Sequence, residues 1–414
     1  MMSPSLKDSA FTVREHYFEG QHIRQFPAAT VEDEYPVKLH AKQYIPKWNT
    51  DPQPGDATLV CAHANGFWKE LYEPLRHDLL MELTYRGVRI RAIWMPDYST
   101  QGESGVLNEP HLGHDMAYSD HARDMLAMIN HFRQDMPRPL IGIGHSMGGT
   151  QMVNLATMHP RLLEGIALVD PSIEATSKLM SPRALAKTTN LRLGSPDIWN
   201  SPEAAVKDLK KSPMMQGWDP RAERLFFESA LRQTPTVLYP NTTGKWTLKT
   251  SKHSGIFAEL RINSEGHGLD GSVSSPEGRS ARADLNPDDS FITPFYNSAV
   301  SNAFKQLKHL RPPVFFVCGS ESALRDEKNL QRMRERTGSG VGGSGGVALG
   351  QVETTTIKSG HLIPMTHPRE LAGKLAAWLE PRLRNSKRRM TSGKGGRPGR
   401  PTMTATPFPK NVRS

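Results

Sequence analysis

Residues 140–149, LIGIGHSMGG, decide how this chain of 414 residues is expected to fold. Leu140 to Gly144 is a short apolar run typical of a buried strand, and the residues after Ser146 have the pattern of a helix. Glycines on both sides of Ser146 permit the crowded turn that lifts a serine hydroxyl above the edge of a sheet. A bare G-x-S-x-G pattern is a weak signal, with a purely structural turn as the alternative. The strand before it and the helix after it favour a nucleophilic serine.

Short apolar runs alternate with helical patterns on both sides of this stretch. Such alternation is typical of βαβ units, so we expect an α/β fold with a mostly parallel central sheet and helices on both faces. The expected strands are residues 57–62, 88–94, 140–144, 165–169, 313–318 and 351–357. The expected helices are residues 69–85, 115–136, 147–158, 323–336 and 370–383.

The alternation stops after Asp170, and this divides the chain into parts. Residues 1–56 are expected to supply N-terminal strands that lead into the sheet, and residues 57–170 and 311–383 to form the α/β core. Residues 171–310 show helical patterns without alternating strands, which indicates a largely helical cap inserted into the core.

The C-terminal region carries the excess positive charge of the chain. From Arg382 to Ser414 there are ten basic residues and no acidic ones, and they account for the whole net charge of +10. The rest of the chain is formally neutral, so no nucleic acid partner is expected. Residues 384–414 are also rich in glycine and proline, which predicts a disordered basic tail. Residues 338–350 are rich in glycine and are expected to form a flexible linker.

The chain has only two cysteines, Cys61 and Cys318, and each lies in an apolar, strand-like run. This placement favours reduced, buried thiols in an intracellular protein. Charged residues interrupt the N-terminus, and no apolar run is long enough for a membrane span, so neither a signal peptide nor a span is expected. The last residues do not match a peroxisomal Ser-Lys-Leu signal, which leaves the cytoplasm and the peroxisome open.

A serine nucleophile needs a general base, usually a histidine that a carboxylate holds in place. In the order serine, acid, histidine, the candidate base is His361, which directly follows the last expected strand. Asp170 ends the strand 165–169 and is the favoured acid, with a turn-forming aspartate before proline as its structural alternative. Glu321, after the strand that ends at Cys318, is the alternative acid. The commonest spacing for an acid in this region would place it one residue later, at Ser322.

The oxyanion of an acyl-transfer intermediate needs two preorganised donors. The backbone N–H of Met147, directly after the serine, is expected to be the first. The second is expected from residues 63–67, with the N–H of Asn65 favoured and that of Phe67 as the alternative. His63 and His145 are interpreted as structural, because the base comes late in this topology.

Four further segments carry a narrower resemblance: residues 63–67 (HANGF), 69–74 (KELYEP), 130–133 (NHFR) and 136–139 (MPRP). From about residue 57 to 383 the chain resembles the α/β-hydrolase superfamily. Within it, these segments are similar to a fungal group that includes hydrolases of toxin biosynthesis and the acyl-CoA thioesterase of mycophenolic acid biosynthesis. The resemblance supports Ser146, Asp170 and His361 as the triad, because in this group the acid follows the strand after the elbow helix.

The resemblance implies a serine hydrolase that cleaves an ester or thioester through an acyl-enzyme, most simply an acyl-CoA thioesterase or esterase of fungal secondary metabolism. Its partner would be a small acyl ester or acyl-CoA. An acyltransferase on the same triad and a non-catalytic hydrolase-fold protein with a basic binding tail are the alternatives. No metal or cofactor is expected, because no cluster has ligand spacing. The sequence does not determine the oligomeric state, and a homodimer is one of the open alternatives. The cap also contains large apolar side chains that either cover an apolar pocket for the acyl group or simply form the core of the cap. They are Trp199, Met214, Met215, Trp218, Phe226, Phe227 and Phe257.

Overall fold

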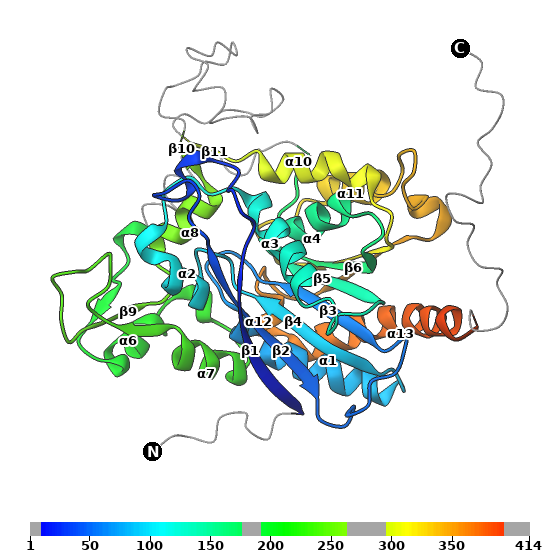
Figure 1. Cartoon of the computed structure of the whole chain (residues 1–414), viewed down its shortest axis with the longest axis horizontal. Coiled ribbons are helices and arrows are strands. Elements are labelled where there is room, and N and C mark those ends of the chain that lie inside the picture. The colour runs from blue at the N-terminus through cyan, green and yellow to red at the C-terminus, as the bar shows by residue number, and fades with distance from the viewer. Residues whose placement is uncertain (1–9, 176–191, 263–294, 393–414) are drawn as a thin grey trace, which may run out of the picture.

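A computed structural model of the chain describes residues 10–175, 192–262 and 295–392. Its centre is an eight-stranded sheet in the order β1-β2-β4-β3-β5-β6-β12-β13 (Figure 1). The strands are β1 (Phe11–Glu19), β2 (Lys38–Pro46), β3 (Ala57–Ala62), β4 (Ile90–Pro96), β5 (Leu140–His145), β6 (Leu163–Val169), β12 (Val314–Gly319) and β13 (Val352–Ile357). The predicted α/β class is confirmed, and the N-terminal strands β1 and β2 form one edge of the sheet.

The six strands from β4 to β13 in this order are parallel to one another. The pairs β1–β2 and β2–β4 are antiparallel. The carboxyl ends of the parallel strands therefore meet at one edge, which is where open α/β sheets place their functional loops. Residues that directly follow β3, β5, β6 and β13 are consequently brought close together.

Helices cover both faces of the sheet. One face carries α1 (Glu73–Tyr85), α12 (Ile363–Thr366) and α13 (Pro368–Ser392), with the short helix η3 (Lys69–Tyr72) leading into α1. The other carries α3 (Tyr118–His131), α4 (Met147–Met158), α10 (Ala299–Gln306) and α11 (Glu327–Arg336). The loop after β4 forms α2 (Gly102–Asn108), which the sequence analysis did not predict.

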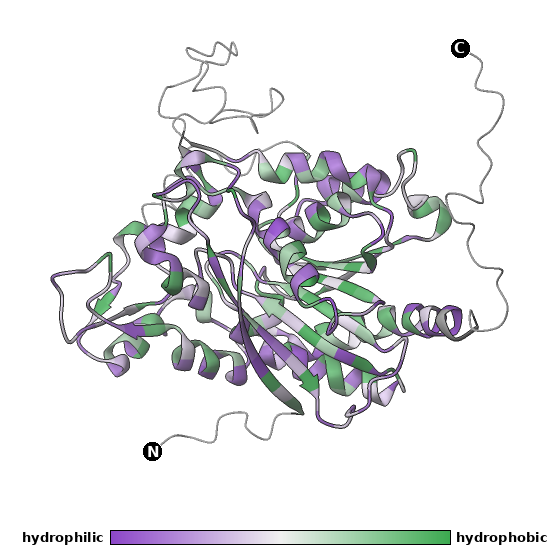
Figure 2. Cartoon of the chain, in the orientation of Figure 1, coloured by the Kyte–Doolittle hydropathy of each residue, from purple (hydrophilic) through white to green (hydrophobic). Residues whose placement is uncertain are grey.

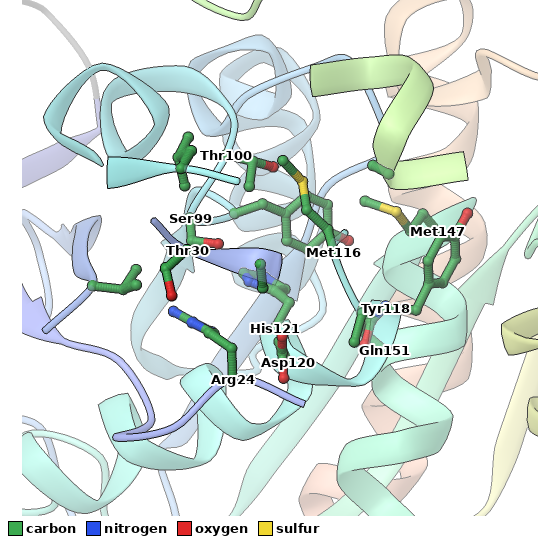
Figure 3. Close-up of a pocket in the computed structure, with 16 residues that line it drawn as sticks. Arg24, Thr30, Ser99, Thr100, Met116, Tyr118, Asp120, His121, Met147 and Gln151 are labelled. Atoms are coloured by element: carbon green, nitrogen blue, oxygen red, sulfur yellow. The ribbon is translucent and has the colours of Figure 1, made fainter. Parts of the chain in front are cut away.

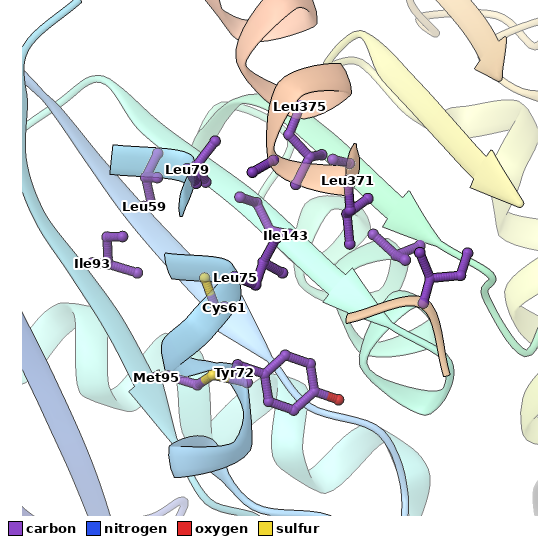
Figure 4. Packing of buried hydrophobic residues seen from close by; sticks show 14 of the residues in the cluster. Leu59, Cys61, Tyr72, Leu75, Leu79, Ile93, Met95, Ile143, Leu371 and Leu375 are labelled. Carbon is purple, nitrogen blue, oxygen red and sulfur yellow. The ribbon is translucent and has the colours of Figure 1, made fainter. Parts of the chain in front are cut away.

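The central strands are buried on both faces, as strands of a covered parallel sheet must be. Leu59 and Cys61 of β3 point into the cluster beneath α1 and α13, while Val60 packs toward α3 and α4. Figure 4 shows Leu75 of α1 and Leu371 of α13 among the residues of the first of these clusters. In Figure 2 the central strands are mostly green and polar residues lie outside them. Cys61 and Cys318 are both buried and free, as predicted.

The insertion between β6 and β12 forms the cap, at the left and upper left of Figure 1. Besides α10, which covers the sheet, its described α-helices are α6 (Pro202–Leu209), α7 (Pro220–Ser229) and α8 (Lys252–Glu259). It also contains a three-stranded sheet of β7 (Ile198–Trp199), β9 (Trp246–Leu248) and β8 (Leu231–Gln233), and a pair of β10 (Arg261–Ile262) and β11 (Phe295–Tyr296). The described part of the cap is thus largely helical, as expected, with short strands that the sequence did not predict.

Two expectations about flexibility also need correction. Helix α13 continues to Ser392, so residues 384–392 are helical rather than part of a disordered tail. The rest of the expected tail lies outside the described residues. The glycine-rich segment 338–350 is a structured turn: the N–H groups of Gly338 and Gly340 donate to the carbonyls of Leu307 and Lys308. The sequence could not indicate this docking, because its partners are about 30 residues away.

Among the described residues, no helix is long and apolar enough to cross a bilayer.

Candidate active site

Ser146 lies at the sharp turn between β5 and α4 in a strained conformation. Its φ is 55° and its ψ is −119°, a backbone conformation that residues other than glycine rarely adopt. The turn is held because the Ser146 N–H donates to the Val169 carbonyl at 2.9 Å and its carbonyl accepts from the Gly149 N–H at 2.9 Å. Strain that the surrounding structure maintains is typical of functional positions.

The two glycines of this turn are required by close backbone contact. A Cβ on Gly144 would lie 2.2 Å from the carbonyl oxygen of Gly148. A Cβ on Gly148 would lie 2.3 Å from the carbonyl oxygen of Ala62, at the end of β3. The start of α4 thus packs directly against the loop that follows β3, and only glycine fits between them.

The structure brings Ser146, His361 and Asp170 into one hydrogen-bonded line. His361 Nε2 lies 2.8 Å from Ser146 Oγ, and His361 Nδ1 lies 2.6 Å from Asp170 Oδ2. The three residues follow β5, β13 and β6, so the common strand edge brings them together. Ser146 is only 6% exposed, so its hydroxyl is largely shielded from solvent. This arrangement can transfer the serine proton to an imidazole that a carboxylate orients.

Asp170 is held as a carboxylate by several donors. The Gly319 N–H donates to its Oδ1 at 3.0 Å, and the Ser322 hydroxyl donates to its Oδ2 at 2.5 Å. Burial alone would raise the pKa of Asp170, but its hydrogen bonds and the nearby His361 hold that pKa below its usual range. Glu321 is exposed, and its N–H donates to the carbonyl of Ser359. The carboxylate at the histidine is therefore that of Asp170.

The two proposed oxyanion donors are both available. Within the described part of the chain, the backbone N–H groups of Met147 and Asn65 have no hydrogen-bond partner. The N–H of Phe67, by contrast, donates to the Ala64 carbonyl at 3.3 Å. The Asn65 side chain donates to the carbonyl of Gly255 in α8 at 2.7 Å, which ties this loop to the cap. The geometry therefore favours Asn65 over Phe67.

A chain of hydrogen bonds joins the loop after β3 to the histidine, and sequence reasoning missed it. The Ala64 N–H donates to the Tyr72 hydroxyl at 2.8 Å, and that hydroxyl lies 2.8 Å from His145 Nδ1. His145 Nε2 lies 2.9 Å from the His361 carbonyl oxygen. Because the carbonyl can only accept, His145 carries its proton on Nε2, and Tyr72 donates to its Nδ1. Burial lowers the pKa of His145 to about 3, which keeps it neutral.

A buried ion pair lies next to the loop that follows β3. Lys69 Nζ lies 2.5 Å from Asp97 Oδ2, and both side chains are fully buried. His63 Nε2 accepts from the Tyr98 N–H at 3.2 Å and lies 3.7 Å from Asp97 Oδ1. Burial lowers the pKa of His63. It contacts neither Ser146 nor His361 through a hydrogen bond within the described residues, which agrees with its structural interpretation.

Ser172 supplies a second hydroxyl beside the nucleophile, which no motif in the sequence indicated. Its Oγ lies 3.2 Å from Ser146 Oγ, and its N–H donates to the Ser146 carbonyl at 3.1 Å. Thr150 of α4 donates to the Ser172 carbonyl at 2.6 Å. These contacts fix the segment after Asp170 against the elbow.

The large apolar side chains of the cap pack mainly on the core beside the site. Trp218 lies 6.1 Å from Phe67, and Phe226 lies 5.2 Å from Trp68, between ring centroids. Trp68 Nε1 also donates to the Ser229 hydroxyl at 2.7 Å. These side chains belong to one buried cluster with the core, so the interpretation as cap core applies to them.

No group of three or more His, Cys, Asp or Glu side chains that could hold a metal ion occurs in residues 10–175, 192–262 and 295–392.

Comparison with known families matches residues 59–374 to a family described as the alpha/beta hydrolase family. The type I acyl-CoA thioesterase mpaH′ of Penicillium brevicompactum is 38% identical over 94% of this chain and 92% of its own. An abhydrolase domain-containing protein of Alternaria alternata, ACTT2-1, is 24% identical over 59% of this chain and 84% of its own. The family resemblance predicted from the sequence is thereby confirmed.

Solved structures share the fold at low sequence identity. The peroxisomal alpha-beta-hydrolase Lpx1 of Saccharomyces cerevisiae superposes with a TM-score of 0.68 at 15% identity, covering 90% of each chain. The thioesterase domain from the curacin biosynthetic pathway gives a TM-score of 0.51 at 15% identity, over 88% of this chain and 99% of its own. At this identity the likeness concerns the fold alone.

Proposed function

Because the chain belongs to the alpha/beta hydrolase family and acts on ester or thioester bonds, we propose that it is an acyl-CoA thioesterase that uses Ser146, His361 and Asp170. The observation that carries the proposal is the line of hydrogen bonds from Ser146 Oγ through His361 to Asp170, at 2.8 and 2.6 Å. The choice of an acyl-CoA substrate rests on the 38% identical relative, which is named as such a thioesterase.

In the first half-reaction, Ser146 Oγ attacks the thioester carbonyl carbon and His361 Nε2 takes the serine proton. Asp170 accepts the Nδ1–H bond throughout and stabilises the imidazolium that forms. The oxyanion binds the N–H groups of Met147 and Asn65. Collapse of the intermediate breaks the carbon–sulfur bond, and the departing thiolate takes the proton from Nε2. The product is an acyl ester of Ser146.

In the second half-reaction, water replaces the thiol. His361 Nε2 takes a proton from the water as its oxygen attacks the acyl carbon, and the same two N–H groups bind the oxyanion. Collapse then releases the carboxylic acid, and Nε2 returns the proton to Ser146 Oγ. Asp170, which its donors keep ionised, is suited to orient the imidazole in both steps.

The test is hydrolysis of acyl-CoA and of p-nitrophenyl esters by wild-type protein, Ser146→Ala and Ser339→Ala. Ser339 is an exposed serine far from the site in sequence, so its variant controls for expression and purity. We expect Ser146→Ala to lose turnover by at least about a thousandfold, because triad residues act as a unit. We also expect a fluorophosphonate probe to label wild-type protein and Ser339→Ala but not Ser146→Ala. Turnover retained in pure Ser146→Ala would refute the proposal.

A further inference from the structure

A cavity beside Met147 is lined by buried polar groups that have no partner. Arg24 Nη2, Thr30 Oγ1, both ring nitrogens of His121 and Gln151 Nε2 all lack a hydrogen-bond partner in the described residues. All four side chains line this cavity, which has a volume of about 40 Å³ and is partly open to solvent (Figure 3). Each of the four residues is less than 9% exposed.

Unpartnered groups of this kind are costly in a folded protein. A buried donor without an acceptor loses its bonds to water and gains nothing in return, so native structures rarely keep several of them in one place. Three of the four residues come from separate elements: Gln151 from α4, His121 from α3 and Thr30 from the segment before β2. Their convergence on one cavity indicates that a bound group supplies the missing partners.

The position of the cavity links it to the proposed reaction. Met147 lines its wall, and the N–H of the same residue is the proposed oxyanion donor. Gln151 lies four residues further along α4, on the same helix face, about 6 Å along the helix axis. An acyl group with its carbonyl oxygen at the Met147 N–H could therefore extend past the Met147 side chain toward Gln151.

The charges around the cavity decide the kind of group it can hold. Arg24 Nη1 donates to both oxygens of Asp124, at 3.0 and 2.9 Å, and Arg123 pairs with Asp120 at 3.1 Å. Two cations therefore balance two carboxylates, which leaves no excess charge for an anion. The free groups of Arg24 and Gln151 can only donate, so they fit uncharged acceptor oxygens.

We propose that this cavity binds the far end of the substrate's acyl group and selects acyl chains that carry an uncharged oxygen, a hydroxyl or a carbonyl, over plain hydrocarbon chains. The inference rests on the proposed thioesterase function and deepens it. Apolar side chains, among them Met116 and Leu112, form much of the remaining wall, beside Ser99, Thr100 and Asp120, and would contact the carbon chain. Thr30, His121 and Gln151 are then residues that determine specificity.

The test compares hexanoyl-, octanoyl- and decanoyl-CoA with the same thioesters bearing a terminal hydroxyl, and with suberoyl-CoA, which bears a carboxylate. We expect wild-type kcat/KM to be about tenfold higher for the best hydroxylated chain than for its plain counterpart, the gain of one good hydrogen bond. Suberoyl-CoA should gain no such preference. Gln151→Met and Thr30→Val remove polar atoms at nearly constant volume, so the preference should fall toward one in both variants. Met152→Leu, on the core side of α4, is the control and should keep it.

Thermal stability gives a second, independent readout. Without ligand, Thr30→Val and Gln151→Met each remove an unsatisfied buried group, so the Tm should stay the same or rise. If ordered water alone occupied the cavity, both variants would lower the Tm and change kcat/KM equally for plain and hydroxylated chains, and the inference would be overturned. Equal wild-type activity on plain and hydroxylated chains would overturn it while leaving the thioesterase function intact. No cleavage of any thioester would instead refute the proposed function.

Discussion

Gly148→Ala offers a direct test of how the elbow and the oxyanion loop depend on each other. The added Cβ would lie 2.3 Å from the Ala62 carbonyl oxygen and 2.8 Å from that of His63, both backbone atoms at the end of β3. Real Cβ contacts stay beyond 3.0 Å, so α4 and the loop after β3 must separate by about 0.7 Å or more. These two segments carry the proposed donors Met147 and Asn65, so the separation would widen the oxyanion site.

The magnitude follows from that displacement. A misplacement of about 1 Å at a catalytic site can cost about a hundredfold in rate, so we expect kcat/KM to fall by about 30- to 100-fold. Overpacking should lower the free energy of unfolding by about 1–3 kcal/mol, of which the better helix propensity of alanine returns up to about 1 kcal/mol. Thioester hydrolysis and urea unfolding measure the two effects.

Gly373→Ala is the matched control, because it makes the same change inside helix α13. A Cβ on Gly373 would meet nothing within 4 Å. This variant should therefore unfold with a free energy about 0.5–1 kcal/mol higher and keep wild-type kcat/KM. If Gly148→Ala folded normally and kept kcat/KM within about twofold of wild type, the argument that this contact sets the oxyanion geometry would be refuted.

Three further predictions concern single side chains. Tyr72→Phe leaves His145 Nδ1 and the Ala64 N–H without partners, so the free energy of unfolding should fall by about 1–3 kcal/mol and kcat should fall with it. Asp170→Asn preserves shape. Because the Gly319 N–H holds the amide oxygen at the Oδ1 position, an NH2 group replaces the Oδ2 that accepts from His361 Nδ1–H, and kcat should fall by about a thousandfold to ten-thousandfold. Burial and the negative charge of Asp326 raise the pKa of Glu174 to about 7. The stability that the protonated carboxyl of Glu174 contributes is fully present below the usual glutamate pKa and is lost as the pH rises through about 7. Glutamine stays uncharged, so above that pH Glu174→Gln should raise the free energy of unfolding by about 1–3 kcal/mol.

Each of these has its own check. For Tyr72→Phe, an unchanged free energy of unfolding in urea would show that the hydrogen bonds from Tyr72 to Ala64 and His145 do not stabilise the protein. For Asp170, kcat within about tenfold of wild type would assign the acid to another residue, and Glu321→Gln then tests the alternative. For Glu174, denaturation series from acid to neutral pH should show the Gln variant and wild type converging at low pH. A constant gap between them would contradict the raised pKa.

The sequence was most informative where local patterns decide structure. Buried strands of a parallel sheet form continuous apolar runs, so 57–62, 140–144 and 165–169 could be located within a residue or two. The order of Ser146, Asp170 and His361 along the chain was enough to expect all three at one edge of the sheet. Their catalytic roles stay a proposal, but the distances needed for them are present.

What the sequence could not indicate depends on contacts between distant segments. Tyr72 lies on a helical turn whose spacing gives no sign of catalysis, and only the fold brings it between Ala64 and His145. The choice between Asn65 and Phe67 likewise required knowing which N–H the loop itself consumes. The unpartnered groups at the cavity come from three separate stretches of chain, the segment between β1 and β2, α3 and α4, so no spacing pattern could have linked them.

The C-terminal charge shows the same dependence on distant partners. Composition predicted a disordered tail from residue 384, yet α13 continues because its basic residues find carboxylates on the core. Lys387 Nζ lies 3.1 Å from Oδ1 of Asp56, whose side chain is 1% exposed. Arg384, by contrast, pairs with Glu380 at 3.2 Å on the surface, where such a pair contributes at most about 1 kcal/mol. The pair with buried Asp56 is the stronger of the two, because removing Lys387 would leave a buried carboxylate with one fewer donor. Part of the excess charge thus anchors the last helix to the sheet, so net charge alone gives no argument for a polyanion partner.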